Sequence, residues 1–345
     1  MLEAEIGRIS VESPFTRYKE HALEVINSLR QKLDRVQTSE SKRLKEFYFY
    51  QIDTGIRWFL IQHRIFKTIL ESSSDKRWAA LRNFVYFYSQ QIGLKTSPLP
   101  FFGEEYYSSG SFPYYRTLAL RLEKEYYVLC VDHTDPPVFW PLALHEIAHC
   151  WLSNRDDVDQ ICGRHLPDLR RIDKDTAENR VEEALCDVVA TCLIGPAYPY
   201  AFVTKLWAQF PVEVSSNYPS YRYRVECMAS ILDRQGFCEE AADLRDIGEG
   251  KSEHGWREEE ISWSLDDLQS VADEVPSPSA TEVKRLARGA STDLESSAPS
   301  DPASLFYAAW LSLDRADPKN TANTTDKMSQ AIIRVLERRS MPSDT

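Results

Sequence analysis

The chain has 345 residues, 43% of them hydrophobic, which is typical of a globular protein with one large or two modest cores. Its formal net charge of −12 at pH 7 argues against nucleic acid or an anionic membrane as a partner, because phosphate groups favour basic surfaces. No apolar run approaches the roughly eighteen residues that a membrane span needs, so we expect no membrane-spanning helix.

The first part of the chain is predicted to be helical. Apolar residues recur at helical spacing from about residue 15 to residue 93, and this pattern predicts three helices. We assign residues 1–95 to an N-terminal helical region. These helices are candidates for contact with a protein partner, and so is the C-terminal part of the chain, residues 303–345.

A change in composition after Gly93 predicts a small β-sheet. Prolines and glycines over residues 98–110 indicate a loop. Residues 114–122 and 126–131 then alternate between apolar and polar side chains, which predicts a β-hairpin. We therefore expect a mainly α fold with a small β-sheet (α+β).

The most informative pattern is Pro141-Leu-Ala-Leu-His145-Glu146-Ile-Ala-His149. Pro141 suits the first turn of a helix, and apolar neighbours can bury that helix. On a helix, His145 and His149 share one face, and Glu146 lies beside them on the same turn. Two imidazoles with an adjacent carboxylate are typical of a catalytic zinc site that holds a water molecule. The alternative is an amphipathic helix whose histidines are ordinary core or surface residues.

A third zinc ligand is expected on a separate helix. A metzincin site would need Gly and His where this chain has Leu152 and Arg155, so we exclude that class. Residues 175–193 have helical apolar spacing and are followed by a Gly-Pro pair. Glu183 and Asp187 lie one turn apart there, so Glu183 can bind zinc while Asp187 accepts a hydrogen bond from a zinc-binding histidine. The alternative is a solvated acidic helix face.

The combination of the HEIAH and EALCD segments resembles the gluzincin metallopeptidases, which include thermolysin and the CAAX prenyl endopeptidases. The resemblance implies a zincin-like catalytic domain with an active-site helix, an edge strand and a glutamate helix. It implies that His145, His149 and Glu183 bind one Zn²⁺ ion per chain. Glu146 would be the general base, and Asp187 would hydrogen-bond to a histidine ligand.

Two further segments are interpreted through the same resemblance. The chain between the two motifs is longer than in thermolysin, so we expect residues 153–174 to form a charged loop beside the substrate cleft. The segment from Tyr218 to Arg224 is similar to a His-Pro…Arg segment of the prenyl endopeptidases, with Tyr218 where that family has histidine. Tyr218, Arg222 and Arg224 are therefore candidates for contact with the transition state or the substrate. The alternative is that they are packing and surface residues.

The last third of the chain is rich in Ser, Pro and acidic residues, and we predict a low-complexity acidic linker over residues 251–302. Helical spacing returns in residues 303–345, which predicts C-terminal helices that either pack on the catalytic unit or form a partner-binding tail. Residues 96–250 are left as the zincin-like metallopeptidase domain.

The seven cysteines are an odd set without a CxxC pair, which favours buried, reduced thiols. Cys150 and Cys186 lie next to motif residues, where a thiol can compete for a metal, but both are expected to be packing residues. The acidic start of the chain does not resemble a secretory signal peptide, so we expect a cytoplasmic location.

These patterns predict a zinc-dependent metallopeptidase that hydrolyses peptide or protein substrates. Zinc would lower the pKa of a bound water, and Glu146 would remove its proton and return it to the leaving amine. Two alternatives remain. One is a regulatory or binding protein that keeps a gluzincin scaffold without catalysis, and the other is a zinc hydrolase of a non-peptide amide.

Overall fold

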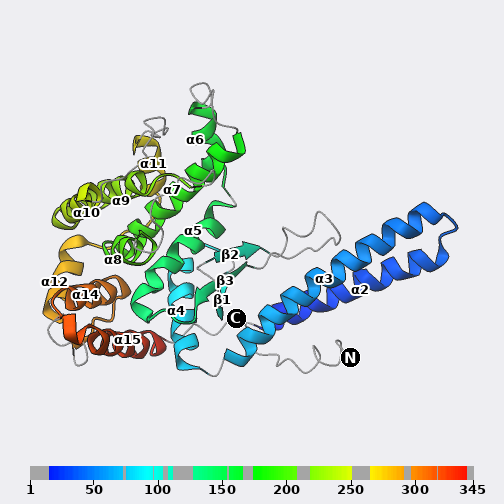
Figure 1. Cartoon of the computed structure of the whole chain (residues 1–345), viewed down its shortest axis with the longest axis horizontal. Helices are drawn as coiled ribbons and strands as arrows, with labels where there is room; N and C mark the ends of the chain where they lie inside the picture. Colours follow the sequence, from blue (N-terminus) through cyan, green and yellow to red (C-terminus); the bar gives the residue numbers. More distant parts are fainter. Residues whose placement is uncertain are drawn as a thin grey trace.

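The chain folds mainly into α-helices with one small β-sheet (Figure 1), which confirms the coarse fold prediction. The computed structural model describes residues 15–72, 75–95, 97–103, 108–111, 127–153, 155–165, 174–207, 218–250, 265–290, 297–316 and 318–339. The strands are β1 (Leu99–Gly103), β2 (Ser108–Ser111) and β3 (Tyr127–Asp132). The larger helices are α2 (Phe15–Thr38), α3 (Lys42–Ser72), α4 (Lys76–Gln91), α5 (Ala143–Leu152), α6 (Asp157–His165), α7 (Lys174–Ile194), α9 (Tyr221–Gln235), α10 (Cys238–Gly250), α11 (Leu265–Ala272), α12 (Ala280–Ala290), α14 (Pro302–Asp314) and α15 (Thr321–Glu337). Short helical turns are η2 (Pro137–Leu142), α8 (Ala197–Ala201), η4 (Phe202–Trp207) and η5 (Pro318–Asn320).

The three predicted N-terminal helices are confirmed, but they divide between two parts of the molecule. Helices α2 and α3 form an antiparallel hairpin that extends away from the other helices (Figure 1). Helix α4 packs against β1, α5 and α15, and it buries Trp78 and Phe84. The structure therefore differs from the predicted boundary at residue 95, because the apolar face of α4 is covered by later parts of the chain. We call the described residues from α4 onward the body.

The sheet has β3 between β1 and β2. β1 runs parallel to β3, with Leu99 opposite Val128. β2 runs antiparallel to β3, with Ser109 opposite Leu129. The strand predicted over residues 126–131 is confirmed as β3.

Two sequence predictions around the sheet have different outcomes. The predicted partner strand over residues 114–122 lies outside the described residues. The loop predicted over residues 98–110 is wrong, because β1 and β2 form there. Pro100 is tolerated because β1 lies at the edge of the described sheet, where a proline need not donate to a ladder. Its carbonyl oxygen instead accepts a hydrogen bond from Trp78 Nε1 at 2.9 Å.

Helices α5 and α7 pack against each other in the centre of the body (Figure 1). The 3₁₀ turn η2 leads directly into α5, and Pro141 lies within that turn, just before the predicted helix. The helix predicted over residues 175–193 is confirmed as α7. It ends at Gly195, whose positive φ of 66° suits glycine, and a side chain there would meet the buried Phe237 ring.

Two segments predicted as irregular contain helices. Residues 157–165, in the predicted charged loop, form α6, which packs on α7 and buries Ile161 and Cys162. The predicted linker is wrong for residues 265–290, which form α11 and α12. On α12 the buried residues are Ala280, Val283, Ala287 and Ala290. These small side chains at helical spacing provide an apolar face despite a mean composition that resembles a linker.

The C-terminal helices pack back on the body. Helix α14 contacts α12 and α8, and α15 contacts α4 and η2. Asn83 on α4 donates hydrogen bonds to the carbonyl oxygens of Leu336 and Arg339, at the end of α15. No helix among the described residues is long and apolar enough to cross a bilayer.

Candidate metal centre

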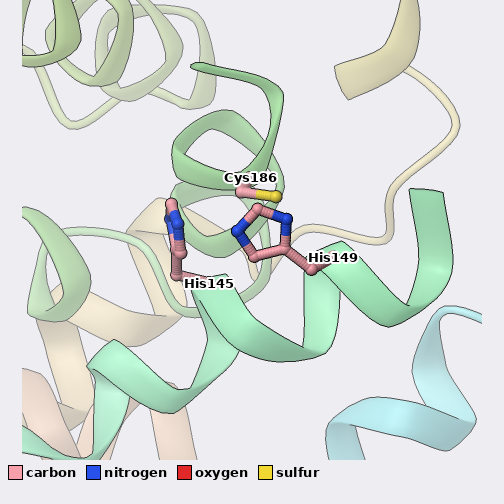
Figure 2. Close-up of side chains that lie close together, drawn as sticks. All are labelled: His145, His149 and Cys186. Atoms are coloured by element: carbon pink, nitrogen blue, oxygen red, sulfur yellow. The ribbon is translucent and has the colours of Figure 1, made fainter. Parts of the chain in front are cut away.

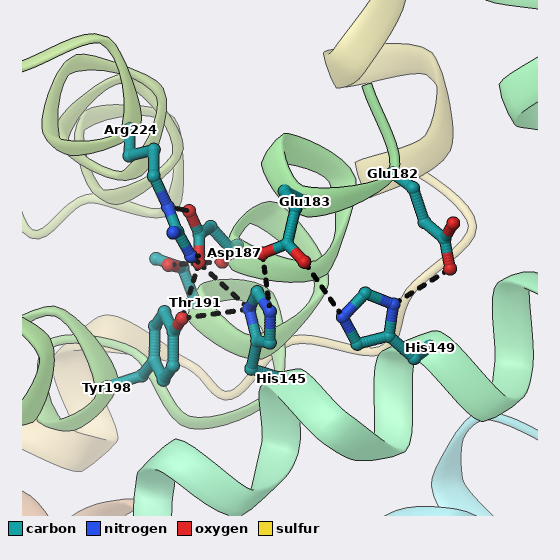
Figure 3. A network of polar contacts seen from close by, with 8 residues as sticks. All are labelled: His145, His149, Glu182, Glu183, Asp187, Thr191, Tyr198 and Arg224. Atoms are coloured by element: carbon teal, nitrogen blue, oxygen red, sulfur yellow. Dashed lines mark hydrogen bonds and ion pairs between the residues drawn. The ribbon is translucent and has the colours of Figure 1, made fainter. Parts of the chain in front are cut away.

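The two motif histidines on α5 face the acidic side of α7 (Figure 3). Glu183 lies between them, with Oε2 at 3.1 Å from His145 Nε2 and Oε1 at 3.4 Å from His149 Nε2. The other ring nitrogen of each histidine also contacts a carboxylate, because His145 Nδ1 lies 3.0 Å from Asp187 and His149 Nδ1 lies 2.8 Å from Glu182. The four sequence-predicted metal-site residues are thus brought together with one residue that was not singled out, Glu182.

These contacts define the orientation of both imidazoles. An ionised carboxylate only accepts hydrogen bonds, so each Nδ1 carries a proton and donates it to Asp187 or Glu182. Both Nε2 atoms are therefore directed at Glu183. This is the orientation in which a histidine can bind a metal through Nε2 while a carboxylate fixes its ring.

The Glu183 carboxylate lies at similar distances from the two Nε2 atoms, through a different oxygen in each case. Zinc–nitrogen distances of about 2.0–2.1 Å in a tetrahedral site imply ligand atoms separated by about 3.3 Å. Glu183 lies 3.1 Å from one Nε2 atom and 3.4 Å from the other. Two imidazole nitrogens and a carboxylate are donor groups that could hold a metal ion, and in its absence the same contacts are ion pairs.

Cys186 is a further donor at this centre (Figure 2). Its Sγ atom and one ring nitrogen each of His145 and His149 all lie within 4.8 Å of one another. Burial raises the pKa of the Cys186 thiol to about 12, so the thiol is neutral at pH 7. Sequence analysis favoured packing over metal binding for Cys186, but its position makes it a second candidate ligand to a metal held by the histidines.

Asp187 is fully buried and is the centre of a hydrogen-bond network (Figure 3). Arg224 on α9 donates to both of its oxygens, from Nε at 2.5 Å and from Nη2 at 2.8 Å. The Tyr198 hydroxyl donates to Oδ1 at 2.5 Å. Burial alone would raise the pKa of Asp187, but Arg224 and His145 outweigh it and lower that pKa. Asp187 therefore stays ionised and can orient His145.

The charges of the centre stabilise one another. Burial lowers the pKa of His145, but the carboxylates of Glu183 and Asp187 outweigh this effect and raise it to about 9. Burial raises the pKa of Glu183, while His145, His149 and Arg224 lower it by more. Without a metal, protonated histidine occupies the place of a cation beside Glu183.

The opposite side of the centre is more open. The Glu182 and His149 side chains are 34% and 22% exposed, whereas that of Asp187 is fully buried. Glu146 is on α5 beside His145, and the contacts that orient the two histidines do not involve it. Its carboxylate is near enough to Tyr218 to raise the pKa of that phenol, after the larger effects of Glu183 and of burial. Tyr218 is half exposed, so this phenol lies at the mouth of the centre.

The predicted arginine candidates differ in position. Arg222 is exposed on α9, and it is not part of the network around Asp187. Arg224 is buried and paired with Asp187, and its Nη2 lies 3.6 Å from Glu183. Arg224 is thus a residue that positions Asp187, which differs from the predicted contact with substrate.

Sequence analysis missed Tyr198 and Glu182 as residues of the centre, and it favoured packing for Cys186. Tyr198 lies on α8, just after the turn at Gly195, and no spacing rule connects it to the motif. Glu182 and Cys186 are the neighbours of Glu183 and Asp187 on α7, so the sequence already predicted where on the helix they lie. Helical spacing is the signal that could have placed them at the centre, because residues three and four positions apart on α7 face α5 together.

Comparisons of this chain with family models, with curated proteins and with solved structures found no match.

Proposed function

We propose that this protein is a zinc-dependent metallopeptidase of gluzincin type. The observation that carries the proposal is the position of Glu183, whose carboxylate contacts Nε2 of both HExxH histidines. Two histidines and one glutamate are the ligand set of catalytic zinc sites, which keep a fourth position for water or substrate. His145, His149 and Glu183 would hold the ion.

When bound, zinc lowers the pKa of a coordinated water and polarises the carbonyl of the scissile bond. Glu146 is the general base, because it is on the same helix turn as the ligands and its carboxylate is not used to orient them. It accepts a proton from the attacking water and returns the proton to the leaving amine. Asp187 keeps the proton of His145 on Nδ1, so that Nε2 stays available.

Tyr218 is the candidate for stabilising the transition state. Glu183 and burial raise the pKa of this phenol, so its hydroxyl stays protonated at neutral pH. A protonated phenol at the mouth of the centre can donate a hydrogen bond to the oxygen on which negative charge develops. Arg224 is already bonded to Asp187 and is therefore assigned a positioning role.

The sheet supports a peptide substrate. β2 is antiparallel to β3, lies at an edge of the described sheet and contacts α5. An extended chain that paired with this strand would pass beside the helix that carries His145 and Glu146. This arrangement supports the proposal that the body is zincin-like. The edge strand beside the active-site helix is then β2, whereas β3, the strand predicted from sequence, lies in the middle of the described sheet.

Metal content and peptide products together test the proposal. We expect about one zinc per purified chain, and new peptide termini in cells that express the wild-type protein but not the Glu146→Gln variant. Glu239→Gln is the matched control, because it changes an exposed glutamate on α10 in the same way and leaves the metal centre intact.

Three results would contradict the proposal. A protein that remains active without metal would exclude zinc catalysis. A zinc-loaded protein that yields no Glu146-dependent termini would favour a binding protein. Glu146-dependent turnover of small amides without peptide cleavage would favour a non-peptide hydrolase.

A further inference from the structure

The hairpin of α2 and α3 exposes most of the large apolar side chains that the described residues leave uncovered. Of the described large hydrophobic residues that are exposed, only Tyr218 and Ile247 lie in the body. The hairpin itself buries few apolar side chains among those described, namely Ala22, Val25, Val36 and Phe59. Large apolar side chains that are exposed in such number leave an uncovered apolar surface on the described part of the hairpin.

Five of the exposed residues form a continuous side of the hairpin. Phe49, Ile56 and Leu60 on α3 are seven and four residues apart, and Leu23 and Leu33 on α2 are ten residues apart, so each set lies along one side of its helix. On each helix, the exposed set is rotated about the helix axis by roughly a quarter to a third of a turn from the buried residues that pack against the other helix. The rotation has the same sense on both helices. Because the helices are antiparallel, the same sense of offset puts both sets on the same side. We call these five residues the apolar flank.

We propose that the apolar flank binds the apolar flank of a second copy of this chain, so that two hairpins form a four-helix bundle. Such an interface is isologous, since the same surface contributes on both sides, and a helical hairpin is the natural half of a four-helix bundle. The hairpin extends away from the body, which leaves room for a second hairpin alongside it (Figure 1).

The exposed area is large enough for a stable dimer. The five side chains are between 37% and 55% exposed. With about 200 Å² for a whole large apolar residue, the five contribute roughly 900 Å² from two copies together. Because homodimer interfaces are only about 65% apolar, this apolar area corresponds to a total of about 1,400 Å², within the range of about 1,200–2,000 Å² of stable interfaces.

The net charge of the hairpin distinguishes a second copy of this chain from an anionic partner, because the two associations depend on salt in opposite ways. Residues 15–72 contain eleven Lys and Arg residues against seven Asp and Glu residues, a net charge of +4, whereas the whole chain carries −12. Two hairpins repel each other weakly, so salt strengthens an association that depends on apolar contact. An acidic protein or an anionic membrane would instead be attracted to the hairpin, and salt would weaken that binding.

The test measures the mass of the full-length protein in solution by light scattering at low and at 0.5 M salt. We expect twice the chain mass of 39.8 kDa at both salt concentrations. The double variant Ile56→Glu/Leu60→Glu is expected to be a monomer with unchanged helix content, because both side chains are exposed in the single chain. Phe47→Glu/Tyr50→Glu is the matched control, since it places the same charges on the other side of α3 and is expected to remain a dimer.

A wild-type monomer at tens of micromolar concentration would overturn the proposal. A dimer that survives Ile56→Glu/Leu60→Glu would show that the interface lies elsewhere and would overturn it too. So would a wild-type monomer that sediments with vesicles of anionic lipid and is released by salt, because the apolar flank would then serve a membrane surface.

Discussion

The two histidines of the candidate metal centre are held by different surroundings. His145 donates to Asp187, which is fully buried and is also bonded by Tyr198 and Arg224. His149 donates to Glu182, a partly exposed side chain. The buried side holds one ligand in a single orientation through charged groups shielded from water. The open side leaves His149 closer to solvent.

The largest expected effect of a single substitution is on the buried side. Arg224→Met removes the guanidinium that is bonded to both oxygens of Asp187 and leaves that carboxylate buried without its main partner. We expect a loss of about 3–5 kcal/mol of unfolding free energy for the metal-free protein, measured by urea denaturation. Arg222→Met, two positions away on the exposed side of α9, is expected to change stability by less than about 0.5 kcal/mol. Equal effects of the two variants would contradict the distinction between the buried and open sides.

The next effect is the pH dependence of zinc affinity. In the metal-free protein the pKa of His145 is raised to about 9 and that of His149 is also raised well above its usual value, and zinc binds only neutral imidazoles. Below pH 9 zinc must displace the proton of His145 and, where His149 is also protonated, a second proton, so zinc affinity falls by at least about tenfold for each unit that the pH decreases. Competition with a chromophoric chelator between pH 6 and pH 8.5 measures this slope. An affinity that levels off above pH 7 would mean that His145 has an ordinary pKa and that its carboxylate neighbours do not act on it as the structure indicates.

A smaller effect compares the two carboxylates that orient the histidines. Asp187→Asn is expected to weaken zinc binding about 10- to 100-fold, because it disturbs the group that fixes the proton of His145 on Nδ1. Glu182→Gln acts on the partly exposed partner of His149, and we expect it to weaken zinc binding less than about tenfold, because water can replace the lost contact. Both affinities come from the same chelator competition. If Glu182→Gln weakened zinc binding more than Asp187→Asn does, our assignment of the buried and open sides would be reversed.

The positions of His145, His149, Glu183 and Asp187 were predicted from sequence because helix periodicity is local. Residues three, four or seven apart share a face whatever the rest of the chain does, and both helices have clear apolar faces. That α5 and α7 then pack together was an expectation from the resemblance alone. It depends on contacts between residues more than thirty positions apart, which spacing does not encode.

The parts that sequence did not predict depend on such distant contacts. Arg224 was singled out as a substrate contact, but its partner Asp187 on another helix gives it a positioning role. Tyr198 was missed because its hydroxyl reaches Asp187 only after the chain turns at Gly195. Helices α11 and α12 were missed for another reason, because mean composition hides a face of small residues such as Ala287.

The most direct test of the central claim is the ligand set of zinc in the loaded protein, measured by X-ray absorption spectroscopy. Our account predicts two imidazole nitrogens, from His145 and His149, and oxygen ligands that include Glu183, all at about 2.0–2.2 Å. It predicts no sulfur at about 2.3 Å, and a Cys186→Ser variant with an unchanged spectrum. A sulfur ligand that disappears in Cys186→Ser would show that the histidines bind metal together with Cys186, and it would contradict the assignment of Glu183.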